Sequence, residues 1–405
     1  MRTTGARHPA QRRPAQHRPA RQDAARRVSN RWGRTLVSAL LLAACQLVVR
    51  ACPAAAAVPP HSRIVGYATG WVPAQDKDAG KIDTLIFAFA KLIGGRVVLD
   101  PAGEDHLRQL TALKAAHPEL RVAISVGGWG AGGFSEAAAG DAGRRAFADS
   151  AAQLIAAHGA DGLDVDWEYP EHSEAGIRAS PRDRANFTLL IEAIRASLDR
   201  AGASRGRTGA NHYTLSIAAA DGPFVGGIDI AAVAPYLDWF NLMTYDFVNS
   251  LTPTTGHHSG LHASRLTPAE ARTTDRAVRQ FLAAGVPPGK LVIGAAFYGR
   301  EFADVQADHH GLYQHYGSYQ GEHPWTELKA NYINSSGFVR YWDAAAQAPW
   351  LWNTRLRRFI SYDDPQSIAA KAAFIKSRHL GGIMYWEQSL DPSGELLEAA
   401  WRGLQ

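Results

Sequence analysis

Eight short segments rich in β-branched and aromatic residues recur between residues 62 and 405, and helical patterns lie between them. This alternation constrains the fold more than any other feature, because strands that alternate with helices build a parallel α/β sheet. Eight such strands predict an α/β fold of the (β/α)8 TIM barrel type. The predicted strands are Ile64–Tyr67, Thr84–Ala90, Arg121–Val126, Gly162–Asp166, Tyr213–Ala219, Trp239–Met243, Leu291–Phe297 and Gly382–Tyr385.

The predicted helices have apolar residues at spacings of three and four. Asp141, Asp183 and Thr267 are candidate N-caps. An open doubly wound sheet is the alternative architecture, but no glycine-rich phosphate loop follows the first predicted strand, as a nucleotide-binding version requires. The predicted helices are Glu104–His117, Asp141–His158, Asp183–Arg200, Pro268–Ala284 and Ser367–Arg378.

Residues 300–358 interrupt the alternation of strands and helices. They are rich in aromatic residues and glycine and show no clear βα pattern. They lie between the seventh predicted strand and the last helix. We therefore expect one barrel domain over residues 62–405, with a small inserted α+β subdomain at 300–358 that raises one wall of a cleft.

The first 57 residues differ from the rest and predict a secretory signal. A basic segment is followed by a short apolar run, residues 35–49, and by small residues at Ala54–Ala57. The run of about 15 residues is short for a membrane span of roughly 20. We expect a secreted, extracellular protein that begins near Val58. The alternative is lipidation of Cys45, because Leu42–Cys45 is similar to a bacterial lipoprotein box; the apolar run continues past Cys45, which favours release.

The net charge of the chain changes sign when this leader is set aside. Residues 1–57 carry 11 Arg, no Lys and one Asp, a net of +10, whereas the whole chain carries +5, so the remainder carries −5. This balance argues against nucleic-acid binding and favours a neutral or cationic substrate. Both cysteines, Cys45 and Cys52, lie in the leader, so the processed chain is expected to lack disulfides. We also expect the protein to be a monomer.

The segment from Asp161 to Pro170 carries the strongest chemical signal. Asp164, Asp166 and Glu168 alternate with apolar residues, so a strand would direct all three carboxyl groups to one face. Their proximity raises the pKa of at least one member, as a general acid requires. The alternatives are a solvated acidic edge strand and a metal site. His257 and His258 belong to no metal-binding pattern, and we expect no metal and no cofactor.

This segment matches the pattern DGxDxDWEYP and resembles the catalytic signature of glycoside hydrolase family 18, the chitinase family. Residues 125–128 resemble the SxGG motif of that family, and residues 243–246 its MxYD motif. The resemblance covers residues 62–405. It implies hydrolysis of the β-1,4 linkages of chitin or chito-oligosaccharides with retention, assisted by the substrate's acetamido group. The implied roles are proton donation by Glu168, orientation of the acetamido group by Asp166 and Tyr245, and proton sharing with Asp166 by Asp164.

The same resemblance implies the substrate-binding residues. Trp386 would form an apolar floor beneath the sugar, and Arg300 would hold Asp246 ionised. The other residues expected to bind substrate are Tyr67, Phe89, Trp129, Tyr169 and Met243. Many relatives place a tryptophan soon after the MxYD motif, and residues 248–251 contain none. Binding of the leaving-group sugars is therefore the least defined part of this expectation.

Three other functions remain open from the sequence. An endo-β-N-acetylglucosaminidase acting on glycoproteins would share the fold and the catalytic signature. A non-catalytic chitin-binding lectin of the same fold usually lacks the acidic glutamate, whereas Glu168 is present here. A non-catalytic envelope protein would require lipidation of Cys45.

Overall fold

The computed structural model describes residues 62–69 and 78–405, and within them eight parallel strands close into a barrel. The strand order is β1-β14-β8-β7-β6-β5-β4-β2, and β1 pairs with β2 to complete the circle. The (β/α)8 prediction is therefore confirmed, and the open sheet is excluded. The bounds are β1 Arg63–Thr69, β2 Thr84–Ile93, β4 Arg121–Gly127, β5 Gly162–Asp166, β6 Thr214–Ala219, β7 Trp239–Leu242, β8 Leu291–Ala296 and β14 Gly382–Trp386.

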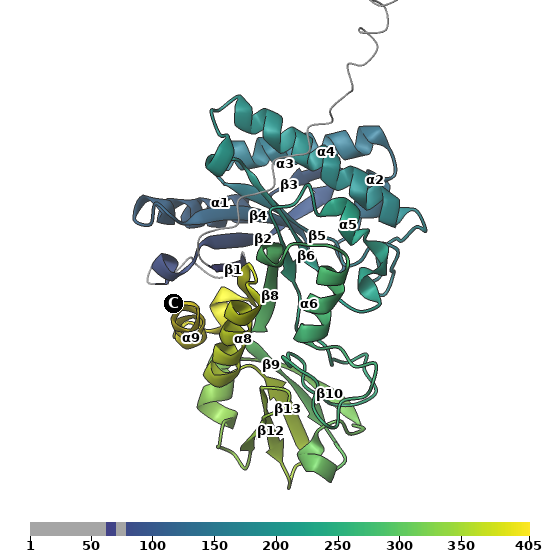
Figure 1. Ribbon diagram of the computed structural model, residues 1–405, viewed down its shortest axis with the longest axis vertical. Helices are drawn as coiled ribbons and strands as arrows, with labels where there is room; N and C mark the ends of the chain where they lie inside the picture. Colours follow the sequence, from purple (N-terminus) through teal and green to yellow (C-terminus); the bar gives the residue numbers. More distant parts are fainter. Residues whose placement is uncertain (1–61, 70–77) are drawn as a thin grey trace, which may run out of the picture. The chain divides into compact units, whose positions relative to one another are not determined.

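Helices cover the outside of the barrel, as α3, α4 and α8 illustrate in Figure 1. Strand residues are buried on both faces because the helices cover one face and the barrel interior the other. Val65, Ile86 and Met384 fill the interior. The helices are α1 Pro101–Ala112, α2 Phe134–Ala138, α3 Asp141–His158, α4 Asp183–Ala203, α5 Ile230–Val233, α6 Thr274–Ala283, α7 Trp325–Glu327, α8 Pro365–Arg378 and α9 Glu395–Leu404.

The predicted N-caps are wrong. Asp141 and Asp183 occupy the first helical positions, after Gly140 and Arg182. The buried Asp183 carboxylate instead accepts hydrogen bonds from the Ser180 backbone N–H and the Ser135 hydroxyl, each at 2.7 Å. Helix α6 begins at Thr274 and not at Pro268.

The cap of α6 is Thr273, whose hydroxyl accepts a hydrogen bond from the Arg276 N–H. Thr267 lies outside that helix and contacts the Tyr313 hydroxyl at 2.8 Å. Helix α1 starts earlier than expected because Asp100 caps it and Pro101 suits the first position.

A second, antiparallel sheet follows β8, with the order β10-β9-β13-β12-β11. Its strands are β9 Tyr298–Ala303, β10 Ser318–Pro324, β11 Val339–Asp343, β12 Ala348–Asn353 and β13 Arg358–Tyr362. The short strand β3, Arg96–Val98, does not belong to this second sheet; it pairs in antiparallel fashion with the end of β2. Phe302, Trp352 and Phe359 form a separate buried cluster on the second sheet. The segment expected as an insertion, residues 300–358, lies within this sheet. Strand β9 follows β8 after one residue, so the second sheet starts at the mouth of the barrel.

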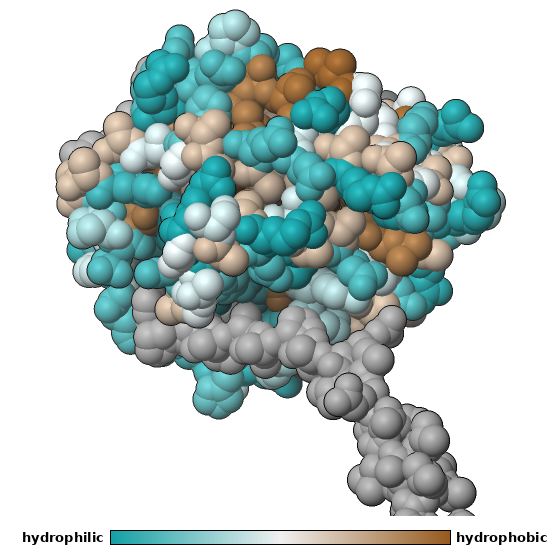
Figure 2. Space-filling model, turned by 90° about the horizontal axis from the view of Figure 1, so that it is seen from above, coloured by the Kyte–Doolittle hydropathy of each residue, from teal (hydrophilic) through white to brown (hydrophobic). Residues whose placement is uncertain are grey.

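The face shown in Figure 2 is mainly hydrophilic, with hydrophobic residues in small separate groups. In residues 62–69 and 78–405, no helix is long and apolar enough to cross a bilayer. The predicted leader, including Cys45, Cys52 and the expected start near Val58, lies outside the described residues.

Candidate active site

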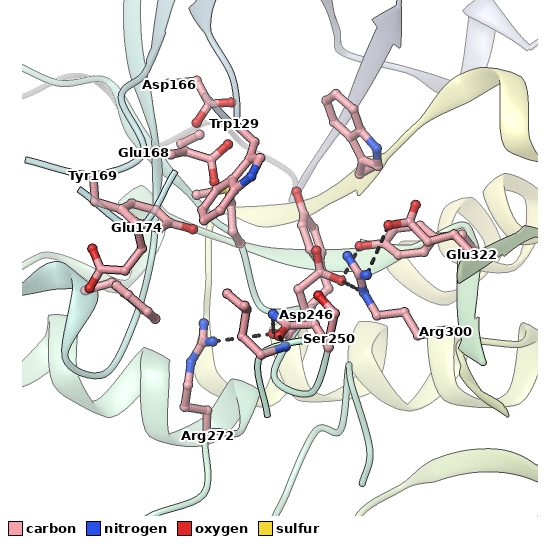
Figure 3. Close-up of a pocket in the computed structure, with 18 of the residues that line it drawn as sticks. Trp129, Asp166, Glu168, Tyr169, Glu174, Asp246, Ser250, Arg272, Arg300 and Glu322 are labelled. Carbon is pink, nitrogen blue, oxygen red and sulfur yellow. Dashed lines mark hydrogen bonds and ion pairs between the residues drawn. The ribbon is translucent and has the colours of Figure 1, made fainter. Parts of the chain in front are cut away.

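A pocket of about 560 Å³ lies at the carboxyl ends of the barrel strands. Catalytic groups occupy this end of the barrel in characterised enzymes with this fold. Eleven of the twelve predicted site residues line the pocket, and Figure 3 shows several of them converging on it. Asp164 is the exception, since it is fully buried. The lining residues that were predicted are Tyr67, Phe89, Trp129, Asp166, Glu168, Tyr169, Met243, Tyr245, Asp246, Arg300 and Trp386.

Side chains alternate along β5, so Asp164 and Asp166 point into the interior of the barrel, whereas the apolar side chains point outward to the helices. Leu163 and Val165 belong to the outer core, and Trp167 stacks on Phe134 with ring centroids 5.4 Å apart. Strand β5 pairs with β4 on one side and with β6 on the other. The acidic run is therefore not an edge strand, which removes that alternative.

Four donors surround the Asp164 carboxylate. Its Oδ2 accepts hydrogen bonds from the Tyr67 hydroxyl at 2.9 Å and the Ser125 hydroxyl at 2.8 Å. Its Oδ1 accepts from the Ser216 hydroxyl at 2.6 Å and the Asn241 amide at 3.1 Å. Burial raises the pKa of Asp164, and these four bonds oppose the increase. The pKa of Asp164 is raised overall, but the two hydrogen bonds to each of its oxygens limit the increase.

Asp166 has a different environment, although it lies only two residues further along β5. Its side chain is buried, and its Oδ1 has no hydrogen-bond partner among the described residues. Burial raises the pKa of Asp166 well above its usual range, and the charges of Glu168 and Asp164 add to the increase. A proton on this pair of aspartates therefore belongs on Asp166 and not on Asp164.

Glu168 lies two residues beyond Asp166 and lines the pocket. Burial raises its pKa to about 7; a hydrogen bond from Tyr169 lowers it, and the negative charge of Asp246 raises it. At neutral pH a substantial fraction of Glu168 is therefore protonated. A partly exposed carboxylic acid with this pKa is suited to donate a proton and to take it back.

Asp246 follows β7 and is held by groups from the second sheet. Its Oδ1 accepts hydrogen bonds from the Tyr298 hydroxyl at 2.7 Å and from Arg300 Nε at 2.5 Å. His258 Nδ1 lies 3.6 Å from the same oxygen. Burial would raise the pKa of Asp246, but His258 and Arg300 lower it below its usual range. Asp246 therefore remains ionised, and Arg300 makes the contact with Asp246 that the family resemblance implied.

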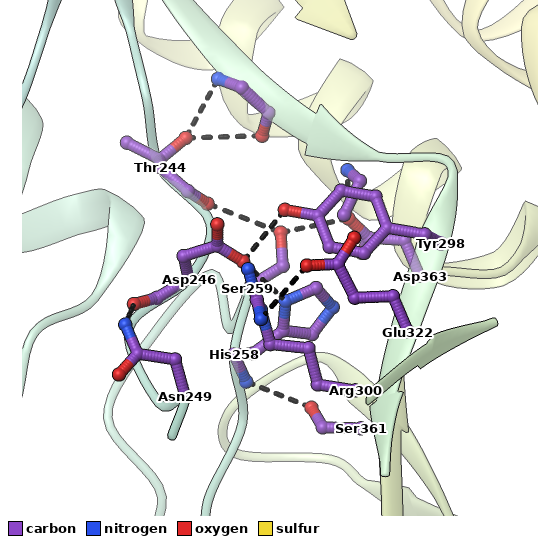
Figure 4. A network of polar contacts seen from close by, with 12 residues as sticks. Thr244, Asp246, Asn249, His258, Ser259, Tyr298, Arg300, Glu322, Ser361 and Asp363 are labelled. Atoms are coloured by element: carbon purple, nitrogen blue, oxygen red, sulfur yellow. Dashed lines mark hydrogen bonds and ion pairs between the residues drawn. The ribbon is translucent and has the colours of Figure 1, made fainter. Parts of the chain in front are cut away.

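The contacts around Asp246 extend in two directions (Figure 4). Toward the pocket, Arg300 Nη1 lies 3.0 Å from Glu322 on β10 and donates to the Tyr319 hydroxyl at 2.5 Å. Beneath the site, the His258 backbone N–H donates to the Ser361 hydroxyl at 2.8 Å. The second sheet therefore contacts Asp246 directly through Arg300, and Ser361 of the same sheet holds the backbone of His258 beside Asp246.

A buried ion pair anchors the neighbouring loop. Lys371 Nζ contacts Asp363 Oδ2 and the Ser259 hydroxyl, each at 2.6 Å. The Ser259 hydroxyl lies 3.1 Å from the Thr244 carbonyl oxygen. This contact fixes the backbone immediately before Tyr245 and Asp246.

Aromatic rings form the floor of the pocket around Trp386, the last residue of β14. The Phe89 ring stacks on Trp386 with centroids 5.7 Å apart, and the Tyr67 ring lies 5.6 Å away. The Tyr245 hydroxyl lies beside Met384 Sδ, at 3.6 Å. An apolar floor below the carboxylates suits the C–H face of a sugar ring.

A second group of side chains forms a wall beside Glu168. Trp129 is 57% exposed, and its ring lies 6.2 Å from that of Tyr169. The Tyr169 ring packs in turn against Phe224 at 5.1 Å. Leu251 lines this part of the pocket and is 71% exposed, at a position where many relatives would have a tryptophan nearby.

Several residues of the site were missed from the sequence. Phe224 begins a short 3-10 helix, Phe224–Gly227, Arg272 lies in the loop before α6, and Tyr319 and Glu322 lie on β10; no motif marks any of them. His258 was considered only as a metal ligand. In residues 62–69 and 78–405, no group of three histidine, cysteine or acidic residues is arranged to hold a metal ion.

Comparisons with known proteins agree with this geometry. The sequence is 40% identical to chitinase A1 of Niallia circulans over 302 residues, which is 71% of this chain and 43% of that protein. The chain therefore spans less than half the length of that relative.

Two solved structures are similar as well. A glycoside hydrolase family 18 N-acetylglucosaminidase from Paenibacillus barengoltzii aligns with a TM-score of 0.80 and 42% identity, over 85% of this chain and all of that one. A mutant class V chitinase from Nicotiana tobaccum in complex with NAG4 aligns with a TM-score of 0.74 and 26% identity, over 85% of this chain and 99% of that one. The sequence pattern of Glycosyl hydrolases family 18 matches residues 63–391. The chain belongs to Glycosyl hydrolases family 18.

Proposed function

We propose that this protein is a chitinase that hydrolyses β-1,4 linkages between N-acetylglucosamine units with retention of configuration. The observation that carries the proposal is a set of three carboxyl groups with different environments, two on β5 and one just beyond it, together with the aromatic floor around Trp386. Asp164 is surrounded by donors, Asp166 has a strongly raised pKa, and Glu168 has a pKa of about 7.

In the proposed first step, Glu168 donates its proton to the glycosidic oxygen and the leaving sugar departs. The acetamido oxygen of the substrate attacks the anomeric carbon and forms an oxazolinium ring. In the second step, ionised Glu168 takes a proton from water, and that water opens the ring. Each of the two steps inverts the anomeric carbon, so the configuration is retained.

Asp166 and Tyr245 would hold the acetamido group during this reaction. Asp166 accepts the acetamido N–H and stabilises the positive charge of the ring as it forms, while the Tyr245 hydroxyl donates to the acetamido oxygen. Asp164 can take up part of the proton shared with Asp166 when the charge develops. Asp246 and Arg300 bind sugar hydroxyl groups near the scissile bond.

The relatives support this substrate. Niallia circulans chitinase A1 is a chitinase by name, and the Nicotiana enzyme was solved with NAG4. The Paenibacillus relative is an N-acetylglucosaminidase, which favours a second candidate function, the release of single N-acetylglucosamine units. Both functions require an N-acetylated sugar over Trp386.

One experiment tests the proposal and separates the candidates. A chito-hexaose labelled at its reducing end is incubated with the protein, and the products are followed over time. Internal cleavage supports a chitinase, whereas only monomers released from one end indicate the second candidate. Cleavage of a high-mannose glycopeptide instead of the hexaose would support an endo-β-N-acetylglucosaminidase. Binding without cleavage would indicate a lectin and contradict the mechanism.

The cellular context is also a proposal. We infer that residues 1–57 direct secretion and are removed, and that the catalytic unit over residues 62–405 acts as a monomer on extracellular chitin. The basic start, the apolar run and the alanines at 54–57 support secretion. The alternative is that Cys45 is lipidated and tethers the protein to a membrane.

A further inference from the structure

Arg272 is a charged residue in the wall beside Glu168 that has no role in the reaction proposed above. It precedes α6 and lines the pocket together with Trp129, Tyr169, Phe224 and Leu251. Figure 3 shows its guanidinium directed up toward the pocket, below Tyr169 and beside Ser250. No sequence motif marks this position.

The side chain of Arg272 is held in a fixed orientation. Its Nε donates to Asp221 Oδ1 at 2.7 Å, and its Nη2 contacts the same oxygen. The Arg272 guanidinium carbon also lies 5.0 Å from the centre of the Phe247 ring. Asp221 is buried, so this anchor does not depend on exposed groups. Fixing the guanidinium in advance reduces the entropy lost when a ligand binds.

The third nitrogen of Arg272 is the one left for a ligand. Among the residues that the structure describes, its Nη1 makes one long hydrogen bond, 3.5 Å from the carbonyl oxygen of Asp246. The side chain remains 20% exposed. Arg300, the other arginine that lines the pocket within the described residues, is already bound to Asp246, Glu322 and Tyr319. Arg272 is therefore the arginine with donor capacity toward the pocket.

The position of Arg272 relative to the reaction follows from the proposed function, on which this inference rests. Tyr245 and Asp166 hold the acetamido group of the sugar above Trp386. The Arg272 guanidinium carbon lies 5.8 Å from the centre of the Phe224 ring, and the Phe224 ring lies 5.1 Å from that of Tyr169, the residue next to Glu168. In the proposed reaction Glu168 gives its proton to the oxygen of the departing sugar, so we place the leaving group along this wall. Sugar hydroxyl and acetamido oxygens are acceptors, and a guanidinium N–H is a strong donor.

We propose that Arg272 is a specificity-determining residue that binds an oxygen of the leaving-group sugar next to the scissile bond. Trp129 supplies an aromatic face for that sugar, and the Arg272 Nη1 N–H fixes its orientation. Leu251 also lines the pocket, but its side chain cannot donate a hydrogen bond, so the Arg272 contact favours leaving groups that carry a sugar oxygen next to the scissile bond.

Two substrates distinguish binding of the leaving group from other roles. Chito-tetraose places sugars on both sides of the cleaved bond, whereas an aryl chitobioside has no sugar in its leaving group. For Arg272→Gln we expect kcat/KM on chito-tetraose to fall roughly 10- to 100-fold, the loss typical of a hydrogen bond to a charged group. The loss on the aryl chitobioside is expected to be much smaller. Arg272→Lys keeps the charge but not the paired contact with Asp221, and it is expected to show the same selective loss to a smaller degree.

The control is Arg279→Gln on α6, which removes an exposed arginine paired with Asp275 at 3.1 Å. Arg279→Gln is expected to leave kcat/KM unchanged on both substrates. Equal losses on the two substrates in both Arg272 variants, or no loss on chito-tetraose, would overturn the inference. If Arg272→Gln does not fold, the same comparison of kcat/KM on chito-tetraose and on the aryl chitobioside is made with Arg272→Lys alone. A parent protein that cleaves neither substrate would instead contradict the proposed function.

Discussion

Gly127 lies against Asp166 so closely that a β-carbon on Gly127 would be 1.9 Å from the Asp166 carbonyl oxygen. Gly127 has a φ of 129°, and the next residue, Gly128, has a φ of 94° and accepts no β-carbon either, because Phe89 is 2.8 Å away. The Gly128 N–H donates to that same Asp166 carbonyl oxygen at 2.9 Å. The two glycines therefore allow the end of β4 to approach the end of β5 closely, at Asp166 and two residues before Glu168.

The first prediction concerns Gly127→Ala. The added methyl group must push Asp166 away, and the positive φ adds strain on the order of 1–3 kcal/mol. We expect a lower free energy of unfolding in urea and a loss of at least about 100-fold in kcat on chito-oligosaccharides, since small displacements of catalytic groups are costly. Gly132→Ala is the control, because a methyl group at that position would have no neighbouring atom within 4 Å. Parent-like kcat in Gly127→Ala would contradict this account.

The second prediction concerns Glu168→Gln. The amide cannot donate the proton, so kcat on chito-oligosaccharides should fall by roughly 10²- to 10⁴-fold while binding is retained. Equilibrium binding of chito-tetraose and initial rates measure the two properties separately. Glu192→Gln, an exposed position on α4, serves as the control. A variant that keeps most of its rate would remove Glu168 from the mechanism.

The third prediction follows from the pKa of Glu168, which is about 7 in the folded protein. In the proposed mechanism the protonated form of Glu168 is the active acid, so kcat should decline as the pH rises through about 7. The folded pKa exceeds the usual value for glutamate, so this residue costs stability once the pH rises above that usual value. At pH 8, Glu168→Gln should therefore be more stable than the parent by roughly 1–3 kcal/mol. Urea unfolding at pH 4 and pH 8 tests the sign, because the difference should nearly vanish at pH 4.

The fourth prediction concerns His258, which is buried beside Asp246. Since His258 helps to lower the pKa of Asp246, His258→Asn should raise that pKa and move the acidic limb of the kcat/KM profile to higher pH. His257→Asn is the matched control. His257 lies 3.2 Å from Asp343 in the second sheet, so its replacement should lower thermal stability without moving the acidic limb. Identical profiles for both variants and the parent would contradict the assigned role of His258.

The fifth prediction concerns the amino terminus. Protein recovered from culture supernatant should begin near Val58, contain no cysteine and be insensitive to reductant, because Cys45 and Cys52 precede that residue. Amino-terminal sequencing provides the measurement. Recovery only from membranes, with a lipid on Cys45, would establish tethering.

The strands could be predicted because their signal is local. Each of the eight barrel strands lies within a few residues of its predicted position, since the apolar run that defines a strand is also the part that is buried. The alternation in β5 likewise placed Asp164 and Asp166 on the interior face of the barrel, and Glu168, two residues later, lines the same pocket as Asp166. The helix starts were less predictable. Asp141 and Asp183 have the right chemistry for N-caps, but the backbone of the preceding residue decides which position becomes the cap.

The contacts that set the pKa of Asp246 and the orientation of Arg272 could not be predicted from sequence patterns. Arg300 and Asp246 are 54 residues apart, and their meeting depends on how β9 leaves the barrel. His258 approaches Asp246 through a loop whose position depends on Ser361. Arg272 reaches the pocket because Asp221, 51 residues earlier, fixes its direction. The resemblance to a family supplied Arg300, but no local pattern could supply His258 or Arg272.

The location of Arg300 on β9 has a consequence for protein engineering. Strand β9 pairs with β10 on one side and with β13 on the other, so the second sheet holds this arginine from both edges. Trimming the segment to obtain a minimal barrel would remove the positive charge that keeps Asp246 ionised. Exchanging it for the corresponding segment of another enzyme would transplant part of the active site along with it. The second sheet therefore supplies part of the proposed active site, and loop grafts intended to reshape the cleft should leave Tyr298–Ala303 in place.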